Sequence, residues 1–150
     1  MKKNNKGFTL VELIVVLVIL AILAAILVPT LLGYIERARS EKDYSTAQTM
    51  RVAAQATIDQ AYGDGYNINN AGGGGATAIT KLEQMTGTFA YSGAGTPGKY
   101  VSLTYQLAGI DTSKVTSFSF YYEKGVIKYG SVVIAGRTYT LGTDGNWSVS

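Results

Sequence analysis

The sequence predicts an α+β fold in which a long N-terminal helix, with its hydrophobic half protruding, packs against a small antiparallel β-sheet. Residues 13–35 carry no charged side chain, and as a helix rising about 1.5 Å per residue they would cross the ~30 Å hydrocarbon core of a bilayer. Residues 100–150 alternate apolar and polar side chains between turn signals, which is typical of antiparallel strands. A chain of 150 residues leaves room for one small globular domain after the helix.

A basic leader, residues 1–7, precedes the apolar segment and is the source of the positive net charge. The chain has 13 basic and 10 acidic side chains, a formal net charge of +3. Removal of the leader would take away three lysines and leave 10 side chains of each sign. The basic excess therefore indicates topology, with the N-terminus held in the cytoplasm by the positive-inside rule, and is poor evidence for binding nucleic acid.

Glu12 is the single carboxylate near the start of the apolar stretch. An ionised carboxylate inside a membrane helix costs about 2.5–3.5 kcal/mol and is usually functional. Lys6 lies six residues earlier, on a different helix face, because helical side chains meet at i,i+3 or i,i+4. A cut between Gly7 and Phe8 would instead create an α-amino group at the depth of Glu12 in a neighbouring, axially offset copy. These residues favour assembly over simple anchoring.

Two ordinary explanations of the N-terminus compete with assembly. A secretory signal peptide has an apolar region of about 7–15 residues that ends at an Ala-x-Ala-like site, whereas here the apolar run continues past the alanines at 21–25 into residues 26–28. A plain signal anchor explains the span and the basic leader. It gives no role to Glu12, although intramembrane carboxylates are rare unless used, or to the Gly7-Phe8 pair.

Residues 6–14, Lys-Gly-Phe-Thr-Leu-Val-Glu-Leu-Ile, resemble the processing and assembly signature of type IV pilins and of the related pseudopilins of secretion and DNA-uptake machines. The resemblance, a class III prepilin leader followed by an apolar helix, extends over residues 1 to about 62. It implies that a membrane-embedded prepilin peptidase cuts after Gly7 and methylates the amine of Phe8. It also implies that Glu12 pairs with Phe8 of another subunit, in a homopolymer built by an assembly platform protein and its ATPase motor.

Residues 8–35 are expected to form the transmembrane, filament-core half of the long helix. Pro29 removes one backbone donor and clashes with the preceding turn, and Gly33 lowers helix propensity by about 1 kcal/mol relative to Ala. We therefore expect a helix break at Pro29 and Gly33. One interpretation is a simple bend, which is common in membrane helices; the other is a segment that melts when subunits pack.

Residues 36–62 are expected to form the amphipathic half of the helix, the first part of a globular head over residues 36–150. Apolar side chains recur at i+3 and i+4, wide enough to cover a sheet: Ala47, Met50, Ala54, Ile58 and Ala61. Charges of both signs crowd residues 36–43 and form either a solvated turn or salt bridges between subunits, each worth about 0–1 kcal/mol. Gly63-Asp64-Gly65 predicts the helix end.

Residues 63–99 are expected to be a variable loop region. Residues 67–75 are polar and Gly-rich, which predicts a mobile surface loop. Residues 76–85 have apolar side chains at helical spacing, which predicts a short helix. Residues 93–98 match the dinucleotide-binding Gly-x-Gly-x-x-Gly string. That string needs a following helix, whereas the next residues alternate like a strand, so we predict a loop and no nucleotide site.

Residues 100–150 are expected to form the antiparallel sheet. Strand patterns cover residues 100–107, 117–122, 126–134, 137–141 and 147–149. Residues 123–125, 135–136 and 143–146 supply the turns between the later strands, and the Asp144-Gly145 pair is a hairpin signal. The amphipathic half of the long helix is the expected cover for one face, because a small sheet needs such a cover for stability.

No enzyme, cofactor or metal site is expected. The chain lacks His and Cys, which removes the commonest catalytic base, the usual nucleophile pairs and the soft metal ligands. Residues 144–146 offer oxygen ligands of the kind calcium uses, but a hairpin turn explains them better. The absence of cysteine departs from the disulfide-closed loop of many Gram-negative pilins and favours a Gram-positive major pilin or a pseudopilin.

The chain has 11 tyrosines and one tryptophan. They could form a stacking platform for nucleic acid or carbohydrate. Tyrosine is also favoured on half-buried strand faces, which is the interpretation that we prefer, and exposed tyrosines can cover subunit contacts.

The expected function is structural: a membrane prepilin that becomes a subunit of a type IV pilus on the cell surface, for adhesion or motility. One alternative is a pseudopilin of a secretion or competence machine. Another, of a different class, is a signal-anchored cell-surface binding module that never polymerises. Long surface fibres would favour a pilus over a pseudopilin, and retention of residues 2–7 would favour the anchor.

Overall fold

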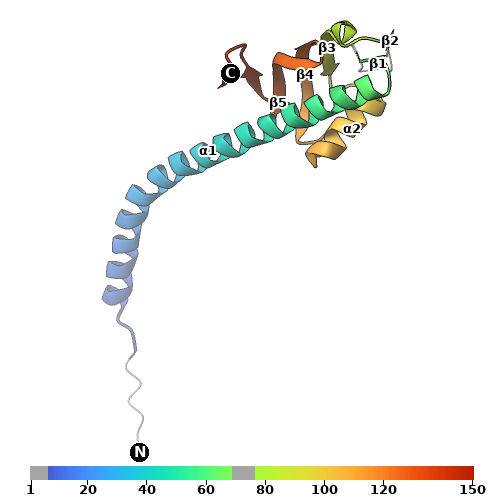
Figure 1. The fold of residues 1–150 in the computed structure, drawn as a ribbon. Helices are drawn as coiled ribbons and strands as arrows, with labels where there is room; N and C mark the ends of the chain where they lie inside the picture. Colours follow the sequence, from blue (N-terminus) through green and yellow to red (C-terminus); the bar gives the residue numbers. More distant parts are fainter. Residues whose placement is uncertain (1–6, 69–76) are drawn as a thin grey trace, which may run out of the picture. The chain divides into compact units, whose positions relative to one another are not determined.

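The computed structural model describes residues 7–68 and 77–150 (Figure 1). The predicted leader up to Lys6, and the larger part of the predicted Gly-rich loop, lie outside the described residues. The chain divides into two units, residues 1–41 and residues 42–150, and each is described by itself.

The first unit consists mainly of the N-terminal part of helix α1, which spans Leu10–Gly63. No residue from 7 to 39 is buried, and the large apolar side chains between Leu13 and Leu32 are each about half exposed or more. Among the described residues, α1 is the one helix long and apolar enough to cross a membrane. The segment predicted to cross the membrane is an exposed apolar helix, which fits membrane insertion.

Helix α1 continues without interruption through Pro29 and Gly33. In the single chain the helix does not end at these two residues, and the kink or loosening expected there stays a prediction. Proline removes only one backbone donor, and the hydroxyl of Thr30 donates to the carbonyl oxygen of Leu27 at 2.8 Å, as hydroxyl side chains do near prolines in membrane helices. Melting of this segment on subunit packing stays a prediction.

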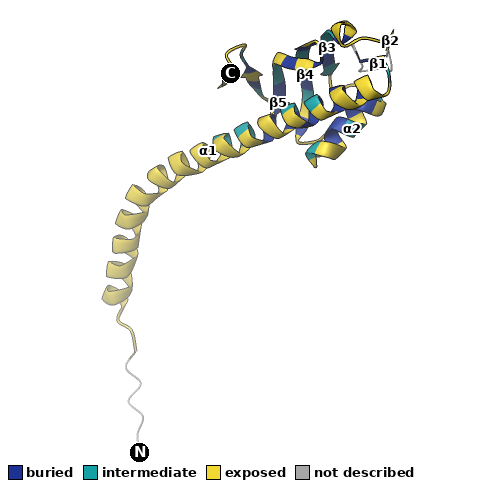
Figure 2. Ribbon diagram, in the orientation of Figure 1, coloured by how far each residue is buried: buried dark blue, intermediate teal, exposed yellow. Residues whose placement is uncertain are grey.

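In the second unit, the C-terminal part of α1 carries the predicted stripe into the core. Side chains at helical spacing are fully buried there, which confirms the amphipathic interpretation: Ala47, Met50, Ala54, Ile58 and Ala61. Figure 2 shows dark blue and yellow alternating around this part of the ribbon. The helix ends at Gly63, and Gly65, at φ +81°, donates its N–H to the carbonyl of Tyr62. The predicted helix end is confirmed.

Five antiparallel strands form the sheet that this helix covers, in the order β3-β4-β5-β6-β7. Lys124, Gly125, Ala135 and Gly136 have positive φ in the two turns that flank β5, as two-residue hairpins require. The predicted strands between residues 115 and 149 are confirmed. The strands are β3 (Gly87–Tyr91), β4 (Val115–Glu123), β5 (Val126–Ile134), β6 (Arg137–Leu141) and β7 (Trp147–Val149).

Part of the region predicted to be loop is strand. β3 is an edge strand of the sheet, and β1 (Tyr66–Asn67) pairs with β2 (Thr77–Ala78). The helix predicted at residues 76–85 is wrong, because the N–H of Ile79 donates to the carbonyl of Gly65 and residues 77–78 are extended in the pairing with β1. One 3₁₀ turn remains, η2 (Leu82–Gln84).

The strand predicted at residues 100–107 is wrong, since this segment is helix α2 (Lys99–Ala108). Its buried side chains are Tyr100, Val101, Thr104 and Tyr105, a helical spacing that the apparent alternation concealed. The hydroxyl of Thr104 donates to the hydroxyl of Thr57 on α1 at 2.9 Å, in a buried contact. α2 therefore packs on α1 (Figure 1). This tertiary contact favours the helix more than the strand-like alternation of apolar and polar residues favours a strand.

A helix thus does follow the Gly-x-Gly-x-x-Gly string, so the reason given above against a nucleotide site is wrong. Other observations replace it. A Cβ on Gly93 would clash with the carbonyl oxygen of Thr116, and Tyr91 donates its hydroxyl to the carbonyl of Gly95 at 3.1 Å. The sheet is antiparallel, whereas the dinucleotide fingerprint belongs to parallel βαβ units. These glycines and their neighbours serve packing of the loop against β4.

Gly130 on β5 lies directly opposite Phe120 on the neighbouring strand β4. A Cβ there would clash with the ring of Phe120 and the carbonyl oxygen of Ser119. We expect Gly130→Ala to lower the free energy of unfolding by about 1–3 kcal/mol, the usual cost of overpacking. Gly63→Ala is the control, because its Cβ would meet nothing within 4 Å. Thermal unfolding of the full chain in detergent measures both, and an unchanged midpoint for Gly130→Ala would contradict the packing.

Candidate processing and assembly site

The N-terminus of α1 is closed by a hydrogen-bonded pair, Thr9 and Glu12. The Oε2 atom of Glu12 accepts hydrogen bonds from the backbone N–H of Thr9 at 2.9 Å and from its hydroxyl at 2.7 Å. The backbone N–H of Glu12 donates in turn to the Thr9 hydroxyl at 3.3 Å. This reciprocal arrangement is a capping box, which satisfies N–H groups that have no partner within the helix.

The capping box gives Glu12 a structural role that the sequence analysis missed. The signal was present, because Thr9-x-x-Glu12 before an apolar run fits the capping-box pattern. Only Oε2 takes part in it, and the Oε1 atom of Glu12 has no hydrogen bond from the residues that the structure describes. The carboxylate is held in place by its own chain and keeps one oxygen for a further donor.

Gly7 and Phe8 precede the first helical residue, Leu10, and are extended or irregular. The side chain of Phe8 is 85% exposed, and a Cβ on Gly7 would meet nothing within 4 Å. The peptide bond between them is therefore accessible to a protease, because exposed backbone outside helices is the kind that proteases reach. Among the described residues, no hydrogen bond joins Gly7 or Phe8 to Glu12 of the same chain.

The charged block at residues 36–43 has no ion pair of its own. Among residues 7–68 and 77–150, the one ion pair joins Lys99 Nζ and Asp64 Oδ2 at 3.0 Å. Asp43 instead accepts a hydrogen bond from the hydroxyl of Tyr139 at 3.2 Å. Glu36, Arg37, Glu41 and their exposed neighbours are free to meet charges on another molecule.

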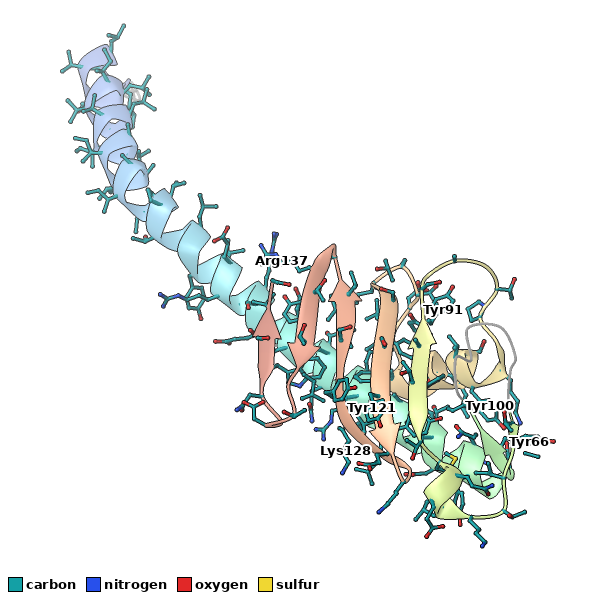
Figure 3. The ribbon with its side chains drawn as sticks, turned by 90° about the horizontal axis from the view of Figure 1, so that it is seen from above. Tyr66, Tyr91, Tyr100, Tyr121, Lys128 and Arg137 are labelled. Atoms are coloured by element: carbon teal, nitrogen blue, oxygen red, sulfur yellow. The ribbon has the colours of Figure 1, made fainter. Side chains whose placement is uncertain are left out.

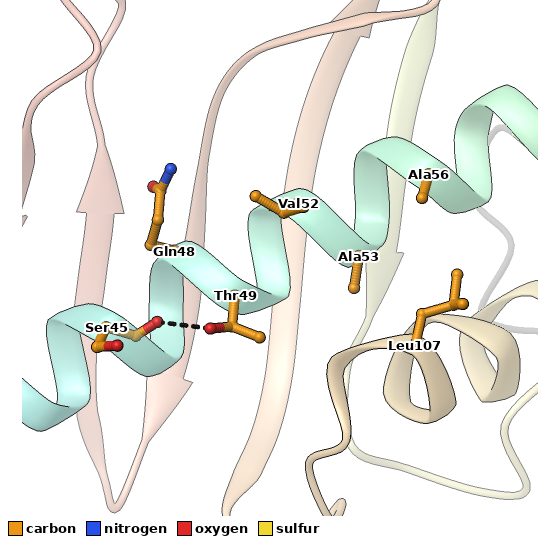
Figure 4. Close-up of a pocket in the computed structure, with 7 residues that line it drawn as sticks. All are labelled: Ser45, Gln48, Thr49, Val52, Ala53, Ala56 and Leu107. Carbon is orange, nitrogen blue, oxygen red and sulfur yellow. Dashed lines mark hydrogen bonds between the residues drawn. The ribbon is translucent and has the colours of Figure 1, made fainter.

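An apolar groove lies in the head between α1 and α2 (Figure 4). It has a volume of about 460 Å³. Val52 and Leu107 contribute its large apolar side chains and are 60% and 53% exposed, with Ala53 and Ala56 beside them. Thr49, on the groove wall, donates its hydroxyl to the carbonyl of Ser45 at 2.9 Å, which leaves little unpaired polarity there.

The turn at residues 143–146 holds its own carboxylate. Asp144 accepts hydrogen bonds from the backbone N–H of Asn146 at 3.1 Å and from its side-chain amide at 2.8 Å. These bonds lower the pKa of Asp144 below its ordinary value. Both oxygens are used as a hairpin turn uses them. The described residues contain no group of three or more His, Cys, Asp or Glu placed to hold a metal ion.

In a comparison with known families, residues 2–28 fit the prokaryotic N-terminal methylation motif. This match marks a class III prepilin leader and is consistent with the type IV pilin family. It indicates a structural, pilin-type precursor that is processed by prepilin peptidase and assembled with other subunits. It also fits membrane insertion before assembly. Neither the curated proteins nor the solved structures gave a match.

Proposed function

We propose that this chain, whose leader is that of a class III prepilin, is a structural subunit of a type IV pilus. It enters the membrane through residues 8–35, loses residues 1–7, is methylated at the new N-terminus and joins a surface filament of identical copies. The observation that carries the proposal is the methylation motif, residues 2–28, placed directly at the start of an exposed apolar helix.

The processing step acts on the Gly7–Phe8 peptide bond. Exposure of Phe8 and the empty surroundings of Gly7 support access by a membrane-embedded prepilin peptidase. Hydrolysis leaves the carboxylate on Gly7 and an amine on Phe8. That amine is the atom that receives the methyl group, and it stays a cation after methylation.

The assembly step pairs Glu12 with the Phe8 amine of another copy. A buried carboxylate is tolerated when a cation or hydrogen-bond donors accompany it. The capping box supplies two donors to Oε2 from the same chain, and Oε1 is the oxygen we assign to the neighbour's amine. In an isolated membrane subunit the Glu12 carboxylate therefore has hydrogen bonds but no counter-charge. Docking of a second copy supplies the positive charge of its Phe8 amine.

The groove between α1 and α2 is the surface that we assign to the neighbouring copies outside the membrane. The apolar half of α1 has to be covered by apolar surface after it leaves the bilayer, because exposing it to water costs about 25 cal/mol per Å². Val52 and Leu107 offer such surface on the head. The charged side chains of residues 36–42, which come just before the groove residues in the sequence, would set the register.

Leu107→Lys tests the groove. We expect it to reduce filament yield at least tenfold while the precursor is still cut, since a lysine in an apolar contact must be desolvated without a partner. Val126→Lys is the matched control, because Val126 is 52% exposed, almost as much as Leu107, and lies outside the groove. Sheared filaments quantified by immunoblot give the yield. Equal yields from the two variants would remove the groove from the interface.

Electron microscopy of cells that express the chain tests the proposed function. Long surface fibres labelled by an antibody against residues 100–150 are expected. Short assemblies confined to the envelope would favour a pseudopilin of a secretion or DNA-uptake machine, and unpolymerised chain at the surface would favour the signal-anchored binding module. The Gram-positive origin suggested by the lack of cysteine has no support from the comparisons and stays a prediction.

A further inference from the structure

The face of the sheet opposite α1 carries a shallow hollow over strands β3 to β6. Figure 3 looks onto this face, with α1 behind the strands. The hollow has a volume of about 350 Å³, and hydroxyl side chains dominate its lining, including Ser119, Tyr121, Tyr129, Ser131, Thr138 and Thr140. Its size is at the small end of the roughly 300–1,000 Å³ typical of ligand sites, so it suits a short part of an extended ligand.

These hydroxyl groups have no hydrogen-bond partner in the part of the chain that the structure describes. The buried tyrosines differ. Tyr105 donates its hydroxyl to the carbonyl of Val115 at 2.8 Å, and Tyr139 donates to Asp43 at 3.2 Å. The hydroxyls around the hollow are thus among the side-chain donors and acceptors that the described part of this domain leaves for another molecule. Each serine or threonine hydroxyl can donate one hydrogen bond and accept two, and each tyrosine hydroxyl can donate one and also accept.

Tyr121 and Tyr129 form a stacked pair of rings in the lining of the hollow. They face each other in the register of β4 and β5, and their rings stack with centroids 4.8 Å apart and planes inclined by 15°. Tyr129 remains 44% exposed. Stacking fixes the ring before any ligand arrives, so little side-chain entropy is lost on binding.

The lining contains no charged side chain. Lys128 on β5 and Arg137 on β6, both labelled in Figure 3, do not line the hollow. A nucleic acid needs several cations along its backbone. An apolar partner would bury the free hydroxyls unpaired, which is unfavourable because they lose their hydrogen bonds to water. The lining therefore matches a ligand that is uncharged, rich in hydroxyl groups and apolar on one flat side.

We infer that this hollow binds a segment of a neutral polysaccharide. The apolar C–H face of one sugar ring would lie on Tyr129, and the hydroxyls at the rim of the ring would bond to Ser131, Thr138 and Thr140. Few contacts per copy imply weak binding, with a Kd of roughly 0.1–10 mM. The site exists on the single chain and does not need the filament, although a filament would present many copies and raise avidity.

The test uses the full chain in a zwitterionic detergent, because sugar-based detergents would compete. Maltohexaose, cellohexaose and chitohexaose are the neutral probes, heparin is the anionic one, and saturation-transfer NMR reports binding. We expect at least one neutral probe to bind and heparin not to bind. Absence of binding by all three neutral probes at about 10 mM, the weak end of the expected range, overturns the inference.

Variants locate the site. Tyr129→Ala should weaken binding of the neutral probe at least tenfold, whereas Tyr66→Ala should not change it, because Tyr66 is 43% exposed but lies in β1, away from the hollow. Tyr129→Ala could also act by loosening the sheet, so a second variant is needed. Thr140→Val removes one hydroxyl and keeps the side-chain shape, and it should weaken binding several-fold. Equal affinity in all of these variants overturns the inference, and so does heparin binding that Lys128→Ala or Arg137→Ala abolishes.

Discussion

Glu12→Val is expected to leave membrane insertion intact and to abolish filaments. Removal of the carboxylate lowers the cost of insertion by about 2.5–3.5 kcal/mol, which outweighs the roughly 0.5–2 kcal/mol lost with the helix cap. The precursor should therefore accumulate in the membrane and still be cut after Gly7. Assembly should fail because the Phe8 amine of the neighbour no longer has a counter-charge. Membrane fractionation and sheared-filament yield measure the two effects.

Two further variants separate the cap from the charge. Glu12→Gln keeps the capping box, since glutamine serves at that position as glutamate does, but it removes the charge. We expect it to lose filaments as Glu12→Val does. Thr9→Val removes the hydroxyl that bonds to Glu12 Oε2 and keeps the charge, so it should reduce filaments only partly. Normal filaments from Glu12→Gln would show that the cap, and not the charge pair, is what Glu12 provides.

Gly7→Glu is expected to block processing almost completely. The peptidase must accommodate the residue before the cut. Glycine has no side chain, whereas glutamate would bring a long, charged one into the peptidase site. The fold should be unaffected, because the position has no neighbour within 4 Å. Immunoblots of membranes should show a single band at precursor size, and intact mass should retain residues 1–7.

Gly7→Ala is the matched control for processing, since it adds one methyl group without charge. It should be cut at a reduced rate and still yield filaments. A product of mature mass from Gly7→Glu would count against the peptidase assignment. Accumulated precursor that nevertheless forms filaments would separate assembly from cleavage and contradict the role of the new amine.

The long helix and most of the sheet could be predicted from sequence because their signals are strong and local. The stripe from Ala47 to Ala61 repeats at helical spacing, and it is fully buried. The strands from 115 onward are rich in β-branched and aromatic residues and are separated by turns that need positive φ, as at Gly125 and Gly136. Local pattern and global fold agree there, which is typical of foldable sequences.

The segment between the long helix and those strands could not be predicted, because tertiary contacts decide it. Residues 99–108 alternate like a strand, yet Thr104 bonds to Thr57 on α1 and Tyr105 bonds to Val115, contacts that favour a helix. In the sequence, the residues of β3 are a short stretch bounded by glycines, with no strand pattern. They form a strand because their backbone pairs with β4. Neither the side-chain contacts of α2 nor the strand pairing of β3 leaves a signal in the local sequence.

The candidate site was predictable in part. Gly7, Phe8 and Glu12 were singled out from the residues and from the resemblance to type IV pilins. The motif match at residues 2–28 spans all three, and their individual roles stay predictions. Thr9 was not predicted as a partner of Glu12, because only cations were considered for the carboxylate. The donors that bond to Glu12 are the backbone N–H and the hydroxyl of Thr9 in the same chain. Glu12 thus combines a local cap with the proposed contact between subunits.

The most direct test of the account is the identity of the first residue of the protein isolated from its cells, determined by N-terminal sequencing and intact mass. The account predicts N-methylphenylalanine, from Phe8, followed by Thr9. A chain that begins at Met1 or Lys2, or an unmodified residue at the cut, would contradict it.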